Sequence, residues 1–556
     1  MHKHMRPIAA ASTAAVLAVV LAACGSSSSS SSGSSAQGKN GGTITIASGT
    51  PPLSADQGLD FTTQGTELYS VINTPLLTFK RGVQGTAGTK IEPALAKSLP
   101  TTSNGGKTLT FMLRPGLKYS NGQPIKASDV TYAIERDIKI PWQAASFVSA
   151  FIKGGTAYAN GKAKTISGIT TDDSTGKIVV NMVRPFAPMV DIFALAGTAP
   201  VPKSTPMKNL ASTGTIGDGP YKWGSISPGH TYTLVKNTKF NGVPASSVPK
   251  GHADKITYQV NSNVLANAES VLRNQSDVFD PGDTLPSSIL NQVQTQAKSR
   301  YQPVPTNSTF YFFFAVNKPL FNNLDARKAV LAALDLRALS RLDSGFLKED
   351  CHLIPFGIIG HSSPSDCTSL TGHAADGAPN MSMAKSLMKK SGMMGKKITV
   401  WGEERSPRRQ YVDYFTDVLN KIGFHATEKI ISSGVYFTTI GAPSTKPQTG
   451  FGDWVQDFPN PWDFMQLFTG SAGSSLNYGY VNDSHYNSQL NTLETKQPSS
   501  VASQWSALDN YAVGKAYYAA YGHEEFPKFY SNKLVFSKGV MSVEYQTDLT
   551  SLELKK

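Results

Sequence analysis

Residues 108–130 read Thr-Leu-Thr-Phe-Met-Leu-Arg-Pro-Gly-Leu-Lys-Tyr-Ser-Asn-Gly-Gln-Pro-Ile-Lys-Ala-Ser-Asp-Val. Polar and apolar residues alternate from Thr108 to Phe111, which is typical of a half-buried strand. The pair Pro115-Gly116 follows this strand and marks a turn. A strand and a turn therefore follow one another here.

A mixture of strands and helices follows along the chain. Apolar or alternating runs predict strands at 43–46, 232–235, 255–260 and 309–316. The run 309–316 is continuously apolar, as in a central strand buried on both faces. Apolar periodicity predicts helices at 325–342, with Asp325 as N-cap, and at 408–422, with Gly423 as the residue that ends the helix. These elements predict an α/β or α+β fold with mixed sheets.

Length and composition exclude several classes of protein. The chain has 556 residues, of which 40% are hydrophobic and 16% are charged. This hydrophobic content argues against disorder, and no apolar run reaches the ~18–20 residues of a mature spanning helix. The formal net charge is +13, but no run of Lys and Arg exceeds two residues. We therefore expect a mildly basic, solvated surface and no nucleic-acid partner.

The first residues have the three parts of a secretory signal. Lys3 and Arg6 precede an apolar stretch that is too short for a stable anchor and ends in Ala22-Ala23-Cys24. Two small residues before a cysteine resemble the lipobox of bacterial lipoproteins, in which the Cys24 thiol would receive a diacylglyceryl group. The alternatives are an ordinary signal peptide with a chance cysteine and a buried cysteine in an N-terminal helix.

On the lipoprotein interpretation, residues 1–23 are a signal peptide and residues 24–40 a flexible, Ser-rich tether. The mature body would be extracytoplasmic, held by lipid on the outer face of the bacterial cytoplasmic membrane.

Two further cysteines, Cys351 and Cys367, remain after Cys24. Outside the cytosol two spare thiols usually pair, and closing the loop between them would stabilise the fold by about 3 kcal/mol in the chain-entropy model. We predict this disulfide, with free thiols as one alternative. A metal site is the other, because four potential ligands lie nearby in the sequence: His352, His361, Asp366 and His373. Their spacing matches no regular zinc pattern, so no metal and no cofactor are predicted.

Motifs of several catalytic classes are absent. The chain contains no G-x-x-x-x-G-K-[ST] phosphate loop, no H-E-x-x-H, no G-x-S-x-G and no paired C-x-x-C. Ser, His and Asp are abundant, so spacing alone leaves a dispersed catalytic triad open. The sequence favours binding over turnover, and we predict that the protein is not an enzyme.

Four stretches resemble family 5 of the bacterial extracellular solute-binding proteins, the oligopeptide and dipeptide receptors of ABC importers. The first is 108–136, in which Lys126 replaces the family's usual capping Thr. The others are Gly-Asp-Gly-Pro-Tyr at 217–221, a strand, Asn and helix at 316–335, and Asp-Trp-Val-Gln-Asp-Phe-Pro at 453–459.

This resemblance implies a periplasmic-binding-protein-like α/β fold of the cluster C type, with two lobes, a hinge and an extra inserted domain. Lobe I would comprise 41–77, 215–305 and 526–556. Domain II, the insertion, would comprise 78–214, and lobe III 306–525. The ligand would lie between lobes I and III, and closure would bury it.

The resemblance also implies ligand-binding residues. In peptide-binding members the aspartate of Trp-x-x-Asp faces the peptide's α-ammonium, which assigns that role to Asp457. The alternative is that Asp457 caps the turn at 458–461. Trp454 and Val455 would lie alongside the ligand, with backbone groups that offer strand-like hydrogen bonds. Trp454 could equally fill the core.

Further candidates come from the two sides of the expected cleft. Thr63 and Gln64, before a helix expected at Glu67, would form the edge of lobe I. Asn477 and Tyr478 would belong to a facing loop. Arg405 is the candidate partner for a ligand carboxylate, against the alternative of a solvated surface arginine.

The leading hypothesis is a monomeric, lipid-anchored peptide receptor that delivers its ligand to ABC permease subunits. One alternative keeps the fold but binds a non-peptide solute, such as an oligosaccharide or a nickel chelate. A secreted, lipid-anchored hydrolase and a signalling or adhesion lipoprotein are the remaining classes.

Overall fold

The computed structural model describes residues 37–556, except 84, 141, 143, 281–284, 286, 443, 470–475, 536–540 and 543–545. The predicted signal peptide, Cys24 and most of the predicted tether lie outside the described residues. No helix within the described ranges combines the length and the apolar character needed to cross a bilayer.

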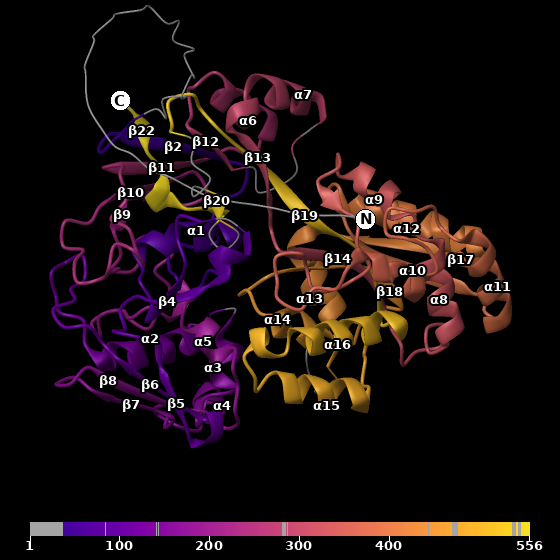
Figure 1. Cartoon of the computed structure of the whole chain (residues 1–556), viewed down its shortest axis with the longest axis horizontal. Coiled ribbons are helices and arrows are strands. Elements are labelled where there is room, and N and C mark those ends of the chain that lie inside the picture. The colour runs from indigo at the N-terminus through magenta and orange to yellow at the C-terminus, as the bar shows by residue number, and fades with distance from the viewer. Residues whose placement is uncertain are drawn as a thin grey trace, which may run out of the picture.

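One large sheet of 12 strands extends through both lobes (Figure 1). Its strands are β2 (Thr43–Ser48), β9 (Tyr221–Ser227), β10 (Thr231–Lys236), β11 (Lys255–Val260), β12 (Val278–Asp280), β13 (Tyr301–Pro305), β14 (Ser308–Phe314), β15 (Leu347–Lys348), β16 (Lys397–Glu403), β17 (His425–Ile431), β18 (Thr449–Val455) and β19 (Tyr518–Tyr530). Their order is β17-β16-β18-β14-β19-β12-β2-β11-β10-β9, and β13 and β15 also pair with β19.

Strand β19 connects the two lobes. Its first part pairs with β14, in the half of the sheet that belongs to lobe III. Its last part pairs with β12 and β13, next to the lobe I strands. Figure 1 shows this strand running between the two bodies of the molecule. Both lobes therefore share one strand, β19.

Lobe I packs its sheet against three main helices, α1 (Thr63–Ile72), α6 (Val264–Leu272) and α7 (Ser287–Gln296). Alternate residues of β2 and β11, such as Ile44, Ile46 and Ile256, are fully buried. Three two-stranded ladders complete the smaller elements: β1 (Gly38–Lys39) with β22 (Leu554–Lys555), β3 (Leu77–Phe79) with β4 (Ile91–Pro93), and β20 (Met541–Ser542) with β21 (Gln546–Thr547).

Domain II contains the sequence quoted first. Its four-stranded sheet has the order β5-β6-β8-β7. The elements are β5 (Thr101–Ser103), β6 (Thr108–Met112), β7 (Ile169–Asp172), β8 (Lys177–Asn181), α2 (Ala127–Lys139), α3 (Ala145–Ser149), α4 (Gly155–Ala159) and α5 (Met189–Ile192). Leu109 and Phe111 point into the core, as the alternation predicted.

Helix α2 begins without a capping side chain from Lys126. Asp129 replaces it in part, because its Oδ2 accepts a hydrogen bond from the backbone N–H of Lys126 at 2.9 Å. The Asp129 side chain, three residues into the helix, thus provides a hydrogen-bond partner for the backbone N–H of Lys126 at the helix start.

Lobe III surrounds β14, which is buried at every position and lies between β18 and β19. Its helices are α8 (Leu324–Ala333), α9 (Leu336–Leu342), α10 (Cys367–Thr371), α11 (Met381–Ser391), α12 (Arg408–Ile422), α13 (Tyr436–Gly441), α14 (Pro461–Met465), α15 (Ser484–Leu493) and α16 (Ala502–Gly514). The predicted central strand and the predicted helix 408–422 are both confirmed, and Gly423 ends α12 in the left-handed conformation.

The single helix predicted at 325–342 is wrong. The chain forms α8 and α9 in its place, and Asn323, rather than Asp325, caps α8 by accepting from the N–H of Ala326. Asp335 caps α9 by accepting from the N–H of Ala338. Its short carboxylate competes with the continuing helix for backbone donors, which starts a new helix there.

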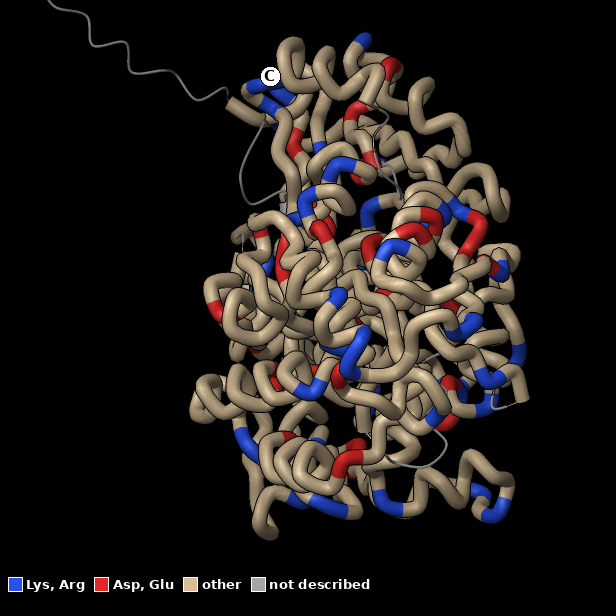
Figure 2. Tube along the Cα trace, turned by 90° about the vertical axis from the view of Figure 1, so that its right-hand side faces the viewer, with Lys and Arg blue, Asp and Glu red and all other residues tan. Residues whose placement is uncertain are grey.

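Two further features complete the fold. Cys351 and Cys367 form a disulfide that joins the segment after β15 to α10. Lys and Arg are spread over the whole trace and lie among Asp and Glu (Figure 2). This distribution agrees with the expected solvated, mildly basic surface.

Candidate functional site

A cavity of about 320 Å³ lies where lobe I, domain II and lobe III meet. Five of the predicted binding residues line it: Thr63, Gln64, Arg405, Val455 and Asp457. The volume lies at the lower end of the range for small-molecule sites. The structure thus brings together residues almost 400 positions apart in the sequence.

The lobe I wall is the first turn of α1. Thr62 caps this helix, because its Oγ1 accepts a hydrogen bond from the N–H of Gly65 at 3.1 Å. The helix therefore starts at Thr63, not at Glu67 as predicted, and Thr63 and Gln64 belong to its first turn. A helix N-terminus carries partial positive charge, so this wall favours anionic or carbonyl groups.

The lobe III wall contains a pair of carboxyl groups, Asp457 and Asp463. The backbone N–H of Asp457 donates to Asp463 Oδ2 at 2.8 Å. Asp463 is fully buried, whereas Asp457 is partly exposed at the cavity. Neither carboxyl forms an ion pair with a Lys or Arg of the described chain.

Burial perturbs both acids. It raises the pKa of Asp463 to about 7. Burial, reinforced by the neighbouring Asp463 carboxyl, raises the pKa of Asp457 well above its usual range. Both shifts favour the protonated form of the carboxyls, and a cation that enters the cavity would favour the ionised form of Asp457.

Trp454 supports this pair but is not among the residues that line the cavity. Its indole N–H donates to Asp463 Oδ2 at 3.2 Å, and the ring packs against the lobe III core. Val455 does line the cavity and ends β18. β16 pairs with β18 at Thr449 and Gly450, so the last residues of β18 extend beyond that register towards the cavity.

Asn477 and Tyr478 hold a loop in the structure and do not line the described cavity. The side chain of Asn477 donates to the carbonyls of Thr469 and Val481 and accepts from the N–H of Val481. Tyr478 is buried against Phe313. In this structure the polar groups of Asn477 and the ring of Tyr478 make contacts within lobe III, and a role of either residue in ligand binding stays a prediction.

Basic side chains form another part of the cavity wall. Arg405 is exposed and lies 3.6 Å from Glu403. Arg408 is buried, lies within 3.5 Å of Glu403 and Asp453, and stacks over Phe310. Arg408 was not predicted to belong to the site, because an arginine at the start of an amphipathic helix resembles a solvated residue.

Other cavity residues also escaped prediction. The lining also contains Arg81 and Ala194 to Ala196, which fall in the predicted domain II range, and Thr306, Glu524 and Gln546. They come from separate parts of the chain, and no local pattern marks them.

Domain II contacts lobe III beside the cavity. The amide of Asn460 donates to Asp191 Oδ2 at 3.0 Å. Phe147 packs edge-on against Phe458 at 5.5 Å between ring centroids, and Phe186 packs against Trp462 at 4.8 Å. These contacts join the segment that carries Asp457 and Asp463 to domain II.

Residues 90–475 match the family described as bacterial extracellular solute-binding proteins, family 5. The chain belongs to this family. The resemblance drawn from the four sequence stretches is confirmed, as is the α/β two-lobe fold.

Individual relatives are more distant. The dipeptide-binding protein DppE of Bacillus subtilis is 24% identical over 400 residues, which cover 69% of this chain and 70% of the relative. The solved clavulanic acid biosynthesis oligopeptide binding protein 2 superposes with a TM-score of 0.82 at 20% identity, over 93% of this chain and 96% of that one. DppA of Helicobacter pylori, solved with the peptide STSA, gives a TM-score of 0.72 at 20% identity, over 93% and 99% of the two chains.

Proposed function

We propose that the protein captures peptides in the cavity between its lobes and delivers them to the permease of an ABC importer. The observation that carries this proposal is Asp457, a carboxyl at the cavity with a raised pKa and no basic partner in the described chain. An enclosed ammonium group needs such an anion, because an unpaired buried charge is strongly unfavourable. A free peptide N-terminus supplies that cation.

The walls of the cavity suit the rest of a peptide. The last residues of β18 offer backbone groups that can pair with an extended chain, as in recognition by strand addition. Such pairing reads the main chain and tolerates varied side chains. Arg405 and the first turn of α1 supply positive charge for carbonyl or carboxylate groups.

The same contacts bear on the competing functions. Trp462, which could stack on a sugar, packs against Phe186 of domain II and is not among the residues that line the cavity. The cavity thus favours an amine-bearing ligand over an oligosaccharide. Members of the family are binding proteins, and we propose that this chain likewise releases its ligand unaltered.

The proposal includes a lipid anchor at Cys24 and a monomeric body that works outside the cytoplasm. The lipobox at Ala22-Ala23-Cys24 supports it. In cells that make the full chain, Cys24→Ala is expected to move the protein from the membrane fraction to the medium or periplasm. Retention of the variant on the membrane would refute the anchor without touching peptide binding.

Calorimetry with di- to tetrapeptides tests the binding function directly. We expect a peptide with a free N-terminus to bind and its N-acetylated form to bind far more weakly. Native mass spectrometry of protein purified from its own cells identifies the natural ligand. The proposal would be refuted if the protein bound neither form of the peptide and if the co-purified ligand had no amine.

A further inference from the structure

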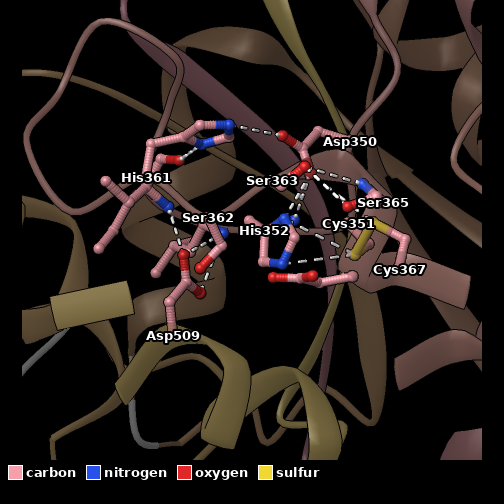
Figure 3. A network of polar contacts seen from close by, with 12 residues as sticks. Asp350, Cys351, His352, His361, Ser362, Ser363, Ser365, Cys367 and Asp509 are labelled. Carbon is pink, nitrogen blue, oxygen red and sulfur yellow. Dashed lines mark hydrogen bonds and ion pairs between the residues drawn. A yellow bond between two sulfur atoms is a disulfide. The ribbon is translucent and has the colours of Figure 1, made fainter. Parts of the chain in front are cut away.

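Three side chains converge on one point away from the cavity. Asp350 Oδ2 lies 3.5 Å from His361 Nε2 and 3.3 Å from His523 Nε2. Their ligand atoms all lie within 4.8 Å of one another. Figure 3 shows the ring of His361 directed at Asp350, near the Cys351–Cys367 disulfide. These three residues are called the histidine cluster below.

The hydrogen bonds of the two rings fix which nitrogen faces Asp350 without its proton. His361 Nδ1 lies 2.7 Å from the carbonyl oxygen of Ile354, which can only accept, so Nδ1 carries the hydrogen. His523 Nδ1 lies 3.0 Å from the carbonyl oxygen of Ser308. In both neutral rings, Nε2 therefore presents a lone pair to the centre of the histidine cluster. Rings that ligate metals are held by the same outer contact.

The carboxylate is oriented in a similar way. Its other oxygen, Asp350 Oδ1, lies 2.7 Å from Nδ1 of His352 and accepts from the backbone N–H of His352 at 3.1 Å. This leaves Oδ2 directed at the two Nε2 atoms. Hydrogen bonds to one oxygen of a ligating carboxylate are a usual feature of metal sites.

The converging atoms are buried and unsatisfied. Asp350 and His523 are 0% and 3% exposed. Asp350 Oδ2, His361 Nε2 and His523 Nε2 have no hydrogen-bond partner among the described residues. Three acceptors facing one another without a proton or cation between them repel, and buried polar groups without partners are rare. A cation at the centre satisfies all three at once.

We propose that the histidine cluster binds a divalent transition metal of the zinc class. Zn²⁺ prefers imidazole nitrogen and carboxylate oxygen at about 2.0–2.2 Å, and a tetrahedral site with such bonds has ligand atoms about 3.3–3.5 Å apart. The separations of 3.3 and 3.5 Å match these edges. Cys351 and Cys367 are bonded to each other, so they supply no ligand.

Three protein ligands leave a fourth position for water. Phe356 packs beside both rings, tilted against His361 at 4.7 Å and edge-on to His523 at 4.8 Å between centroids, and it is itself 42% exposed. The site is separate from the cavity. Glu524, the next residue of β19, lines the cavity, and successive side chains of a strand point to opposite faces.

A bound ion would fasten the segment 350–361 to β19, the strand shared by both lobes. The inference is independent of the peptide proposal, since it uses none of the residues assigned to peptide binding. The rival explanation is a metal-free cluster in which one or both rings are protonated and form ion pairs with Asp350.

The test uses the mature chain, stripped of metal with a chelator and titrated with Zn²⁺ by calorimetry. We expect one Zn²⁺ per chain. His361→Gln and His523→Gln are each expected to weaken binding at least about 100-fold, beyond the 10–100-fold that loss of an outer partner costs. His425→Gln, on the exposed face of β17, is the matched control and should bind as the wild type does.

Two further readouts separate binding from folding. Zn²⁺ should raise the melting temperature of the wild type and of His425→Gln but not of His361→Gln, which replaces the most exposed ligand and is expected to keep its circular dichroism spectrum. Co²⁺ should give the visible spectrum of a four-coordinate site. Equal Zn²⁺ binding by the wild type and by His361→Gln would overturn the proposal, as would the absence of stoichiometric binding by the wild type.

Discussion

Replacing Asp457 by Asn tests the centre of the binding hypothesis. The substitution keeps the size and shape of the side chain but removes its ability to ionise. Asp457 lines the cavity, and its backbone N–H bond to Asp463 does not depend on its side chain. The fold should therefore survive, and the change should act on the ligand's ammonium group.

The loss of binding free energy in Asp457→Asn follows from two opposing contributions, the attraction between the charges and the cost of ionising Asp457. A carboxylate and an ammonium about 4 Å apart attract by about 4 kcal/mol at an effective dielectric constant of ~20. The raised pKa of Asp457 reduces this, because each unit by which the pKa exceeds the ambient pH costs about 1.4 kcal/mol on ionisation. We expect a net loss of about 2–3 kcal/mol, which is about 30- to 150-fold in affinity.

The assay is calorimetry on a two-by-two set: wild type and Asp457→Asn, each with a peptide and with its N-acetylated form. Acetylation removes the cation, as the substitution removes the anion. The wild type should prefer the free peptide by about 2–3 kcal/mol, and the variant should have lost most of this preference. Circular dichroism and melting curves check that the variant is folded.

The reasoning fails if Asp457→Asn binds the free peptide as tightly as the wild type does. It also fails if the wild type does not distinguish the free peptide from the acetylated one. In either case the raised pKa of Asp457 would reflect burial alone, and the turn at 458–461 would be the better explanation of this residue.

Three other outcomes follow from the same contacts. Because burial raises the pKa of Asp457, binding of a free-amine peptide should release up to about one proton and should become tighter as the pH rises through that pKa. The acetylated peptide should show neither effect. Calorimetry in buffers of different ionisation enthalpy measures the number of protons released. Burial raises the pKa of Asp463 to about 7 in the folded protein, compared with about 4 in the unfolded chain. The stability that this difference contributes to the ligand-free protein is therefore fully present below pH 4 and is lost as the pH rises through 7. Between pH 4 and 7 the melting temperature of the wild type should fall more than that of Asp463→Asn. Replacing Cys351 and Cys367 together by Ser should lower the free energy of unfolding by about 3 kcal/mol in urea titrations, and an unchanged midpoint would show that the disulfide constrains little.

Local patterns in the sequence were enough to predict several elements. The continuous apolar run at 309–316 became the buried strand β14, and the spacing of apolar residues at 408–422 became α12. These signals succeed because burial of a strand or a helix face depends on nearby residues. The prediction of one helix at 325–342 was wrong because Asp335 caps a new helix, and the spacing of apolar residues alone does not reveal such a cap.

The cavity wall shows a finer limit of sequence reasoning. Val455, Gln456 and Asp457 all line the cavity, whereas Trp454 is not in its lining and donates to Asp463. Strand alternation does not account for this, because three consecutive residues at the end of β18 and just beyond it reach the cavity. Nothing local could have joined His523 to Asp350 and His361, because the contact depends on how β19 passes lobe III.

The pair Asp457 and Asp463 conflicts with the rule that buried charges have partners, and this conflict is informative. Burial raises both pKa values, which disfavours two adjacent charges in the ligand-free protein. A fold selected for stability alone would place an apolar or amide side chain at the partly exposed position. The carboxyl of Asp457 at the cavity is explained if the ligand is its partner, because an ammonium group of the ligand would provide the positive charge that no Lys or Arg of the described chain provides. Entry of the cation then ionises Asp457 and strengthens the contact most when the surrounding lobes exclude water.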